Sequence, residues 1–344
     1  MTKRRCLFMV MRLVFAWTFF PASAQDALSV REAVRQALRK NYDIIIAADD
    51  AEAARRGDTW AAAGAFPTAG AGASVTTARV AIDQQFSSGT TARQRGVEQT
   101  NLQAYAHLQW RVFDGMRMFA TKERLAEIRE RGESALRQQV AQSVADVMML
   151  YYALVRTDKQ MDVVRSQLQA VLERKSVADV RESAGLAART DVLQARMDVN
   201  DVQAQLMDLR TKRRKDELAL QTVMGMDTTG SIRCADDIRV DTSLDVQRLR
   251  RRLLGANERV LQSMIDLRIA RLQKREAAAA GLPGLDLQAG YMFNRSRNSA
   301  GFALFNENNG FSAGANLVVP LFNGLRTDAE LEQRQLEILK KEHS

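Results

Sequence analysis

The stretch that decides the fold reads WRVFDGMR at residues 110–117, and a second version of it, VPLFNGLR, occurs at residues 319–326. The two stretches align under a shift of 209 residues. Upstream, a shift of 216 aligns a further series: Leu28 with Leu244, Val30 with Val246, Leu38 with Leu254, Asn41 with Asn257 and Pro67 with Pro283. The shared order of landmarks indicates a tandem duplication. We place the first structural repeat at residues 25–228 and the second at residues 229–344.

The residues before each turn alternate in polarity with a period of two, which predicts β-strands. From residue 102 to 112 the even positions are apolar: Leu102, Ala104, Ala106, Leu108, Trp110 and Val112. The odd positions are mostly polar: Gln103, Tyr105, His107, Gln109 and Arg111. Residues 285–294 and 311–319 repeat the pattern, and residues 69–82, rich in Ala, Gly and Thr, form the weakest of the four predicted strands.

Each of these strands is predicted to be about 10 residues long, the length that a tilted strand needs to cross a bilayer. In a membrane the even face would contact lipid and the odd face a water-filled lumen. A soluble, half-buried sheet is the alternative that alternation alone leaves open. Four strands cannot close a barrel, and open sheet edges are not tolerated in lipid. A membrane sheet would therefore require several chains, and three copies would supply twelve strands.

A very long helix is predicted after the first turn. No proline and one glycine, Gly132, occur between Gly115 and Gly185, so a continuous helix would extend about 100 Å. Its apolar residues recur in steps of four and three, typical of a coiled coil: Val140, Val144, Val147, Tyr151, Leu154, Met161, Leu168 and Leu172.

A turn at residues 185–190 then leads into a shorter return helix, from Asp191 to about Val223, with Thr190 as the expected N-cap. The apolar side of this helix is predicted to consist of Val192, Leu193, Val199, Val202, Leu206 and Leu209. The long helical hairpin thus occupies residues 116–224.

The N-terminus has the three parts of a secretory signal peptide. Lys3, Arg4 and Arg5 precede an apolar run, and Ala22-Ser23-Ala24 forms a cleavage signal, so residues 1–24 would be removed and Gln25 would become the first residue. Cleavage removes four basic residues and no acids, which lowers the formal charge from +9 to +5. An exported protein of that charge rarely meets nucleic acid.

Composition argues against metal and thiol chemistry. The two histidines, His107 and His343, are far apart in sequence, and Cys234 remains the single cysteine after cleavage, so it is expected to be a bystander. P-loop, HExxH, GxSxG and Cys/His motifs are not present in the sequence. We therefore expect no catalytic residue, no bound metal and no cofactor.

Taken together, LSVREAVRQALRKN (28–41), AFPTAGAGAS (65–74), WRVFDGMR (110–117), AGLAARTDVLQARMDVNDVQAQLMDLR (184–210), GLPGLDLQAGYMF (281–293) and VVPLFNGLRTDAELEQ (318–333) resemble the TolC-like outer-membrane efflux protein family. The resemblance covers nearly the whole mature chain. It implies a mixed α and β fold, in which four transmembrane strands per chain join a shared trimeric 12-stranded barrel and long α-helical coiled-coil hairpins extend into the periplasm.

The resemblance also implies a function. The chain would be the outer-membrane channel of a tripartite efflux or type I secretion system, a homotrimeric passive conduit that works with a periplasmic adaptor protein and an inner-membrane pump. The adaptor would dock on the hairpin tip, formed by Gly185, Leu186, Ala187, Thr190 and Asp191. A periplasmic coiled-coil adaptor or scaffold without a membrane barrel is the alternative. Only residues 325–344 follow the second turn, so we expect about 90 residues of a second hairpin to be missing from this sequence.

Overall fold

The computed structural model describes residues 27–227, 230–238, 245–247, 257–301 and 303–343. The predicted signal peptide, residues 1–24, lies outside these described residues. The sequence also predicts a helix from Leu244 to about Ala280 at the start of the second repeat, and residue 244 and residues 248–256 of this stretch lie outside the described residues as well. By its contacts the chain divides into two compact units. A helical unit comprises residues 1–40 and 144–240, and a sheet unit comprises residues 41–143 and 241–344.

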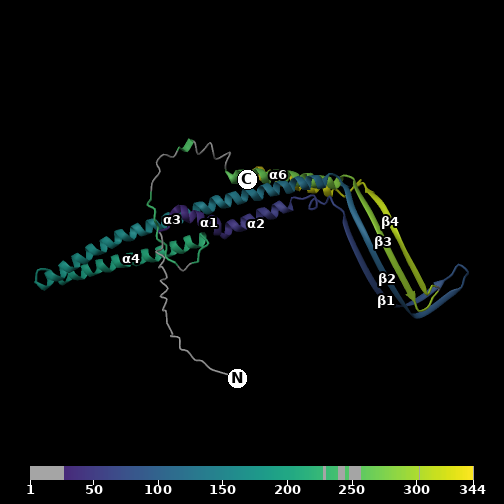
Figure 1. Cartoon of the computed structure of the whole chain (residues 1–344), viewed down its shortest axis with the longest axis horizontal. Coiled ribbons are helices and arrows are strands. Elements are labelled where there is room, and N and C mark those ends of the chain that lie inside the picture. Colours follow the sequence, from purple (N-terminus) through teal and green to yellow (C-terminus); the bar gives the residue numbers. More distant parts are fainter. Residues whose placement is uncertain (1–26, 228–229, 239–244, 248–256, 302, 344) are drawn as a thin grey trace, which may run out of the picture. The chain divides into compact units, whose positions relative to one another are not determined.

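The helical unit contains α1 (Val30–Lys40), the part of α3 (Arg117–Ser183) that begins at Val144, and α4 (Arg189–Val223). The 67-residue α3 and the shorter α4 confirm the predicted long helix and its return. They run as an antiparallel pair (Figure 1). At the base of this pair, a fully buried core brings residues of α3 and α4 against α1: Val147, Tyr151, Leu154, Leu220, Met224, Ala33 and Ala37.

The apolar seam of α3 follows the predicted spacing as far as Met161 and then differs by one residue. Met161 is 4% exposed, but Leu172 is 45% exposed and Val171, at 5%, is buried in its place. After Met161 the seam continues at Val164, Leu168 and Val171, in steps of three, four and three residues. The prediction for Leu172 was therefore wrong, because Val171 packs against α4 in its place. On α4, Leu193 is also exposed, since the neighbouring Val192 occupies the buried position.

A short segment after α4 is tied to the base of the helical unit. Leu28 and Cys234 form an isolated parallel bridge. The hydroxyl of the buried Tyr151 donates to the Leu28 carbonyl at 2.7 Å and accepts from the backbone N–H groups of Ala235 and Asp236 at 3.2 and 3.1 Å. Burial raises the pKa of the Tyr151 hydroxyl to about 12 and that of the Cys234 thiol to about 11. Cys234 is thus protonated at neutral pH, as expected for a structural cysteine.

The sheet unit contains α2 (Tyr42–Gly57), α6 (Glu258–Ala278), the 3₁₀ turn η1 (Ala279–Gly281), α7 (Arg326–Glu342) and the first part of α3. Asn41 and Asn257 are the N-caps of α2 and α6, where their side chains accept hydrogen bonds from backbone N–H groups. Asn41 separates α1 from α2, whereas the residues directly before Asn257 lie outside the described part of the chain. In each half of the chain a capped helix is followed by two strands and another helix.

Four antiparallel strands form one sheet in the order β1-β2-β3-β4 (Figure 1). They are β1 (Thr68–Gln85), β2 (Thr91–Asp114), β3 (Gly284–Asn298) and β4 (Phe305–Val318). The four predicted strands are confirmed, but at 14 to 24 residues they are longer than predicted. The extra length of β1 and β2 comes from polar residues beyond the alternating segment that still pair, as in the Arg93–Asp83 ion pair at 2.7 Å.

Both copies of the opening motif adopt the same turn. Gly115 and Met116 have φ of 70° and 71°, and Gly324 and Leu325 have φ of 69° and 60°. Two successive left-handed residues reverse the chain, and the next residue begins a helix, α3 in one case and α7 in the other. Gly115 is also required for space, because a Cβ there would lie 2.6 Å from the Ala279 carbonyl oxygen. The motif thus joins a strand to a helix twice.

Candidate functional site

The register of the sheet sorts the side chains of all four strands onto two different faces. Ala106 on β2 is directly opposite Ala71 on β1 and Tyr291 on β3, and Tyr291 is opposite Phe311 on β4. Directly opposed residues of antiparallel strands share a face, and residues two apart on one strand do too. The first face therefore carries Ala69, Ala71, Ala73, Val75, Leu102, Ala104, Ala106, Leu108, Trp110, Leu285, Leu287, Ala289, Tyr291, Phe293, Phe311, Ala313, Ala315 and Leu317, with Asn309 and Arg295 as polar exceptions. We call it the apolar face.

The opposite face is polar and largely uncharged. It carries Thr68, Gly70, Gly72, Ser74, Gln103, Tyr105, His107, Gln109, Arg111, Asp286, Gln288, Gly290, Met292, Asn294, Asn308, Gly310, Ser312, Gly314 and Asn316. The glycines give room to aromatic rings: a Cβ on Gly70 would lie 2.8 Å from the His107 ring, and one on Gly72 would lie 2.8 Å from the Tyr105 ring. The weak alternation of β1 in the sequence therefore has a packing cause.

Large apolar side chains of the first face are solvent-exposed in the single chain. Val75 is 67% exposed, Tyr291 50% and Phe311 72%. Soluble monomers rarely expose apolar patches spanning a whole sheet, and larger ones mark an interaction with protein or membrane. No helix in the described parts of the chain is both long and apolar enough to cross a membrane.

At the foot of the sheet the alternation of β2 is interrupted by a bulge. The pairing with β3 passes from Arg111 opposite Asp286 directly to Phe113 opposite Leu285. Because Leu285 belongs to the apolar face, Phe113 takes the position there that the sequence pattern had assigned to Val112. A bulge inserts one unpaired residue and so moves every later side chain of the strand to the other face. A prediction based on strict alternation assigns these later residues to the wrong face.

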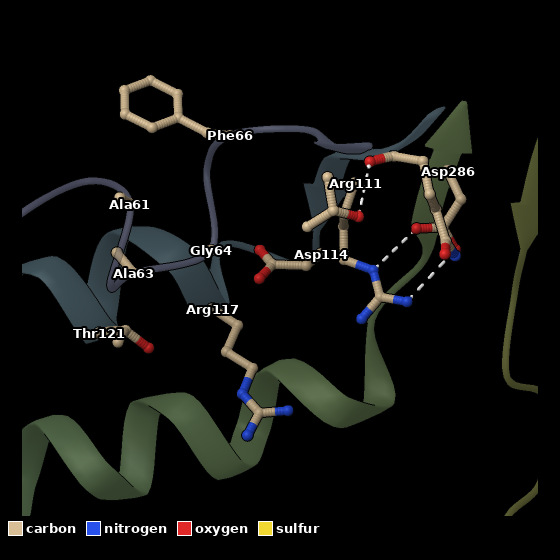
Figure 2. Close-up of a pocket in the computed structure, with 11 residues that line it drawn as sticks. Ala61, Ala63, Gly64, Phe66, Arg111, Asp114, Arg117, Thr121 and Asp286 are labelled. Atoms are coloured by element: carbon tan, nitrogen blue, oxygen red, sulfur yellow. Dashed lines mark hydrogen bonds and ion pairs between the residues drawn. The ribbon is translucent and has the colours of Figure 1, made fainter. Parts of the chain in front are cut away.

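A cavity of about 370 Å³ lies beside this bulge (Figure 2). The Arg111 guanidinium makes two hydrogen bonds to Asp286, at 2.8 and 3.4 Å. Arg117, at the start of α3, also lines the cavity. The Asp114 carboxylate accepts the Met118 N–H at 3.0 Å and so caps the first turn of α3. Two arginines and two aspartates balance in charge, which suits a joint between sheet and helix better than an anion site.

The Trp110 side chain lies on the apolar face, close to the bulge of β2. Its Nε1–H donates to the Ala65 carbonyl at 2.9 Å, in the loop between α2 and β1. In the same loop the buried Asp58 carboxylate binds Lys122 and Arg129 of α3. Sequence reasoning did not identify these tethers. Asp114 and Asp286 could have been found by pairing the strands in register.

The hairpin tip lies in the helical unit, between the ends of α3 and α4. Gly185 has φ of 72°, its N–H donates to the Glu182 carbonyl, and the N–H of Leu186 donates to the Arg181 carbonyl at 2.7 Å. These bonds form a Schellman ending of α3. The Leu186 side chain is 78% exposed, so an apolar group protrudes at the tip.

The expected N-cap of α4 was wrong. The helix begins at Arg189, so Ala188 is at the N-cap position and Thr190 lies within the first turn. The side chain that caps the start of the helix belongs to Asp191 rather than Thr190, since the Asp191 carboxylate accepts a hydrogen bond from the Ala188 N–H at 3.3 Å. The structure thus brings Gly185, Leu186, Ala187, Thr190 and Asp191 together at the tip.

Beside the tip, a groove of about 640 Å³ lies between α3 and α4. Its charged lining residues come in both signs: Arg174, Arg181, Glu173, Asp191 and Asp198. Such a surface can exchange ion pairs with a partner helix. Among the residues that the structure describes, no group of three or more His, Cys, Asp or Glu side chains could hold a metal ion.

Comparison with known proteins links this geometry to a family. The sequence model described as "Outer membrane efflux protein" matches residues 33–226, more than half of the chain. The outer membrane protein TolC of Vibrio cholerae is 26% identical over 193 residues, which are 55% of this chain and 44% of that protein. The chain therefore spans less than half the length of that relative.

Solved structures share the fold. The Campylobacter jejuni CmeC outer membrane channel superposes with a TM-score of 0.74 at 14% identity, over 91% of this chain and 66% of that one. The Neisseria gonorrhoeae MtrE outer membrane channel, described in its open state, superposes with a TM-score of 0.61 at 16% identity, over 91% of this chain and 68% of that one.

Proposed function

The chain belongs to the outer membrane efflux protein family, and from that premise we propose that it is the outer-membrane channel component of a tripartite efflux or type I secretion system. In this role it resides in the outer membrane with its helices in the periplasm. It acts as a passive conduit rather than an enzyme, and an inner-membrane pump supplies the energy.

The observation that carries this proposal is the sorting of side chains by the strand register. Four neighbouring strands present one mainly apolar face and one polar, largely uncharged face. A soluble sheet buries its apolar face under a second layer, whereas a transmembrane barrel exposes it to lipid and surrounds water with the other. Ala106, Leu108 and Trp110 are thus proposed to contact lipid, and Gln103, His107 and Gln109 to line the lumen.

Closure of the barrel requires more than one chain. β1 and β4 are the edges of the four-stranded sheet, so each leaves one row of backbone groups without a strand partner in the described part of the chain. In hydrocarbon such groups cost several kcal/mol each, and only a closed barrel removes them. We propose that three copies pair β1 of one chain with β4 of the next, which gives a homotrimer with twelve strands.

The hairpin tip is the proposed docking point for a periplasmic adaptor. Gly185, Leu186 and Ala187 form a turn with an exposed apolar side chain, and Thr190 and Asp191 begin the return helix. The mixed charges of the adjoining groove support docking of another helical hairpin. We further propose that residues 25–228 and 229–344 are two structural repeats, supported by their shared helix-strand-strand-helix order.

Membrane fractionation separates this function from that of a periplasmic coiled-coil scaffold. The full chain, expressed in a Gram-negative host, is expected in the outer-membrane fraction, to resist extraction by alkaline carbonate and to dissolve in detergent. Release by carbonate would show that the sheet does not cross the membrane and would favour the scaffold. Substitution of Leu186 by Asp is the matched control, since it changes the tip and should leave fractionation unaltered.

A further inference from the structure

We propose that the end of the apolar face farthest from the helices binds the phosphate group of a membrane lipid. The binding surface consists of Arg295 and Arg297 on β3 with Phe293 on β3 and Phe305 on β4, and we call it the arginine–aromatic girdle. The inference rests on the proposed function, because it requires the apolar face to lie in a membrane.

The register places the two arginines on the same face as the apolar side chains. Arg295 is directly opposite Leu102, and Arg297 is directly opposite Thr100 and Phe305. Charged groups at the end of a lipid-facing strand are tolerated only near the headgroups, since they are costly deeper in the bilayer. The girdle therefore marks a second membrane boundary.

The spacing along β2 agrees with the thickness of a membrane. Trp110 lies at the foot of the apolar face and Thr100 ten positions farther along the strand. At about 3.4 Å per residue and a tilt of about 40°, Thr100 and its neighbour Arg297 lie about 26 Å above Trp110. The apolar band of an outer-membrane barrel is about 25 Å tall, so Trp110 and Arg297 are at its two borders.

The contacts within the girdle leave one guanidinium open to a ligand. Arg295 is paired with Glu307 at 2.7 Å, and its guanidinium lies 5.4 Å from the centre of the Phe293 ring. Arg297 lies 6.0 Å from the centre of the Phe305 ring, and within the described residues it forms no ion pair. Stacking on an aromatic ring uses the face of the guanidinium and leaves its in-plane N–H donors for an oxyanion.

The surrounding charges favour an anion. Three arginines, Arg79, Arg295 and Arg297, share the face at this level with two acids, Glu98 and Glu307. Glu98 is directly opposite Arg79, and Glu307 is directly opposite Arg295. Glu307 is ion-paired with Arg295, whereas Arg79 forms no ion pair among the described residues and donates to the Gly96 carbonyl at 3.4 Å. The three arginines exceed the two acids by one positive charge, and the Arg297 guanidinium can donate two parallel hydrogen bonds to a phosphate group. Phe305, 54% exposed, would then contact the upper part of the acyl chains.

Native mass spectrometry of the detergent-solubilised full chain, titrated with phosphatidic acid, measures lipid binding. Arg297→Gln is expected to weaken the apparent Kd for phosphatidic acid about fivefold, the effect of one arginine at an anionic membrane surface. Arg297→Lys should retain part of the affinity. The matched control is Arg93→Gln, which removes an exposed arginine of the same sheet that is paired with Asp83 and lies outside the girdle, and it should leave the Kd within a factor of about two.

An unchanged Kd in Arg297→Gln, or an equal loss in Arg93→Gln, would overturn the proposal. Displacement of the lipid by inorganic phosphate at similar concentrations would also overturn it, because the ligand would then be the free ion. Flotation with pure phosphatidylcholine vesicles separates this inference from the proposed function. Failure of the wild-type chain to insert there would contradict the membrane sheet itself, whereas insertion without any preference for phosphatidic acid would contradict only the girdle.

Discussion

Replacement of Ala106 by Arg provides a quantitative test of the apolar face. Ala106 lies between Ala71 and Tyr291 in the sheet, four positions from Trp110 along β2. With a strand rise of about 3.4 Å and a tilt of about 40°, its side chain is about 10 Å above the Trp110 level. That height is close to the middle of an apolar band about 25 Å tall, where an arginine is most costly.

The expected loss is ~2–4 kcal/mol of the free energy of unfolding for Ala106→Arg. Gln103→Arg is the matched control, because Gln103 lies on the opposite face between Ser74 and Asn294, both uncharged, and should change the free energy by less than ~1 kcal/mol. Urea unfolding of protein refolded into phosphatidylcholine bilayers measures both values. Equal losses at the two positions would refute the assignment of faces, and a small loss at both would indicate a sheet that never enters the bilayer.

The other predictions concern the helices. Tyr151→Phe leaves the Asp236 N–H without its hydroxyl acceptor, while the Ala235 N–H keeps its bond to the Leu28 carbonyl at 2.9 Å. The substitution should lower the unfolding free energy of the helical unit by ~1–3 kcal/mol in chemical denaturation, and Tyr152→Phe should change it little. Gly185→Ala places a Cβ at a φ of 72° and should cost ~1 kcal/mol, seen as faster amide hydrogen exchange confined to the tip; a change that spreads along α3 would argue against a local turn. Hydrogen bonds from Arg137 and Ser134 hold the pKa of the Glu258 carboxyl below its ordinary value of 4.5, so this interaction stabilises the fold fully above pH 4.5 and is lost as the pH falls through the lowered pKa. Thermal melting of wild type and Glu258→Gln should therefore differ at neutral pH and converge in acid, and a constant difference would contradict the linkage.

Much of the architecture could be predicted because the patterns are long and regular. The repeated turn, the absence of proline between Thr68 and Leu282 and the heptad spacing predict the long helix, its return and the strands. The positions that sequence reasoning missed depend on a neighbour in space. Val171 replaces Leu172 in the seam because of how α3 meets α4, and the alternating Ala and Gly of β1 reflect the rings of Tyr105 and His107 on the next strand.

The two faces of the sheet could be predicted from the alternating pattern, but the bulge in β2 and the N-cap of α4 could not. Alternation along β2 identified the two faces from a single strand, and the register of the other three strands extends the same sorting. The bulge at Val112 could not be read from the sequence because one inserted residue leaves the local composition unchanged. Thr190 was a good N-cap by residue type, but the Asp191 carboxylate accepts the Ala188 N–H, and this allows the helix to begin two residues earlier than predicted.

Cysteine accessibility shows whether one face of the sheet contacts lipid while the other contacts water. The variants carry a single cysteine in a Cys234→Ser background, in place of Ala104, Ala106 or Leu108 on one face and of Gln103 or Gln109 on the other. Each variant is reconstituted in lipid vesicles and treated with a membrane-impermeant maleimide. We expect fast labelling at positions 103 and 109 and protection at positions 104, 106 and 108, with the protection lost in denaturant. Equal labelling of neighbouring odd and even positions would contradict it.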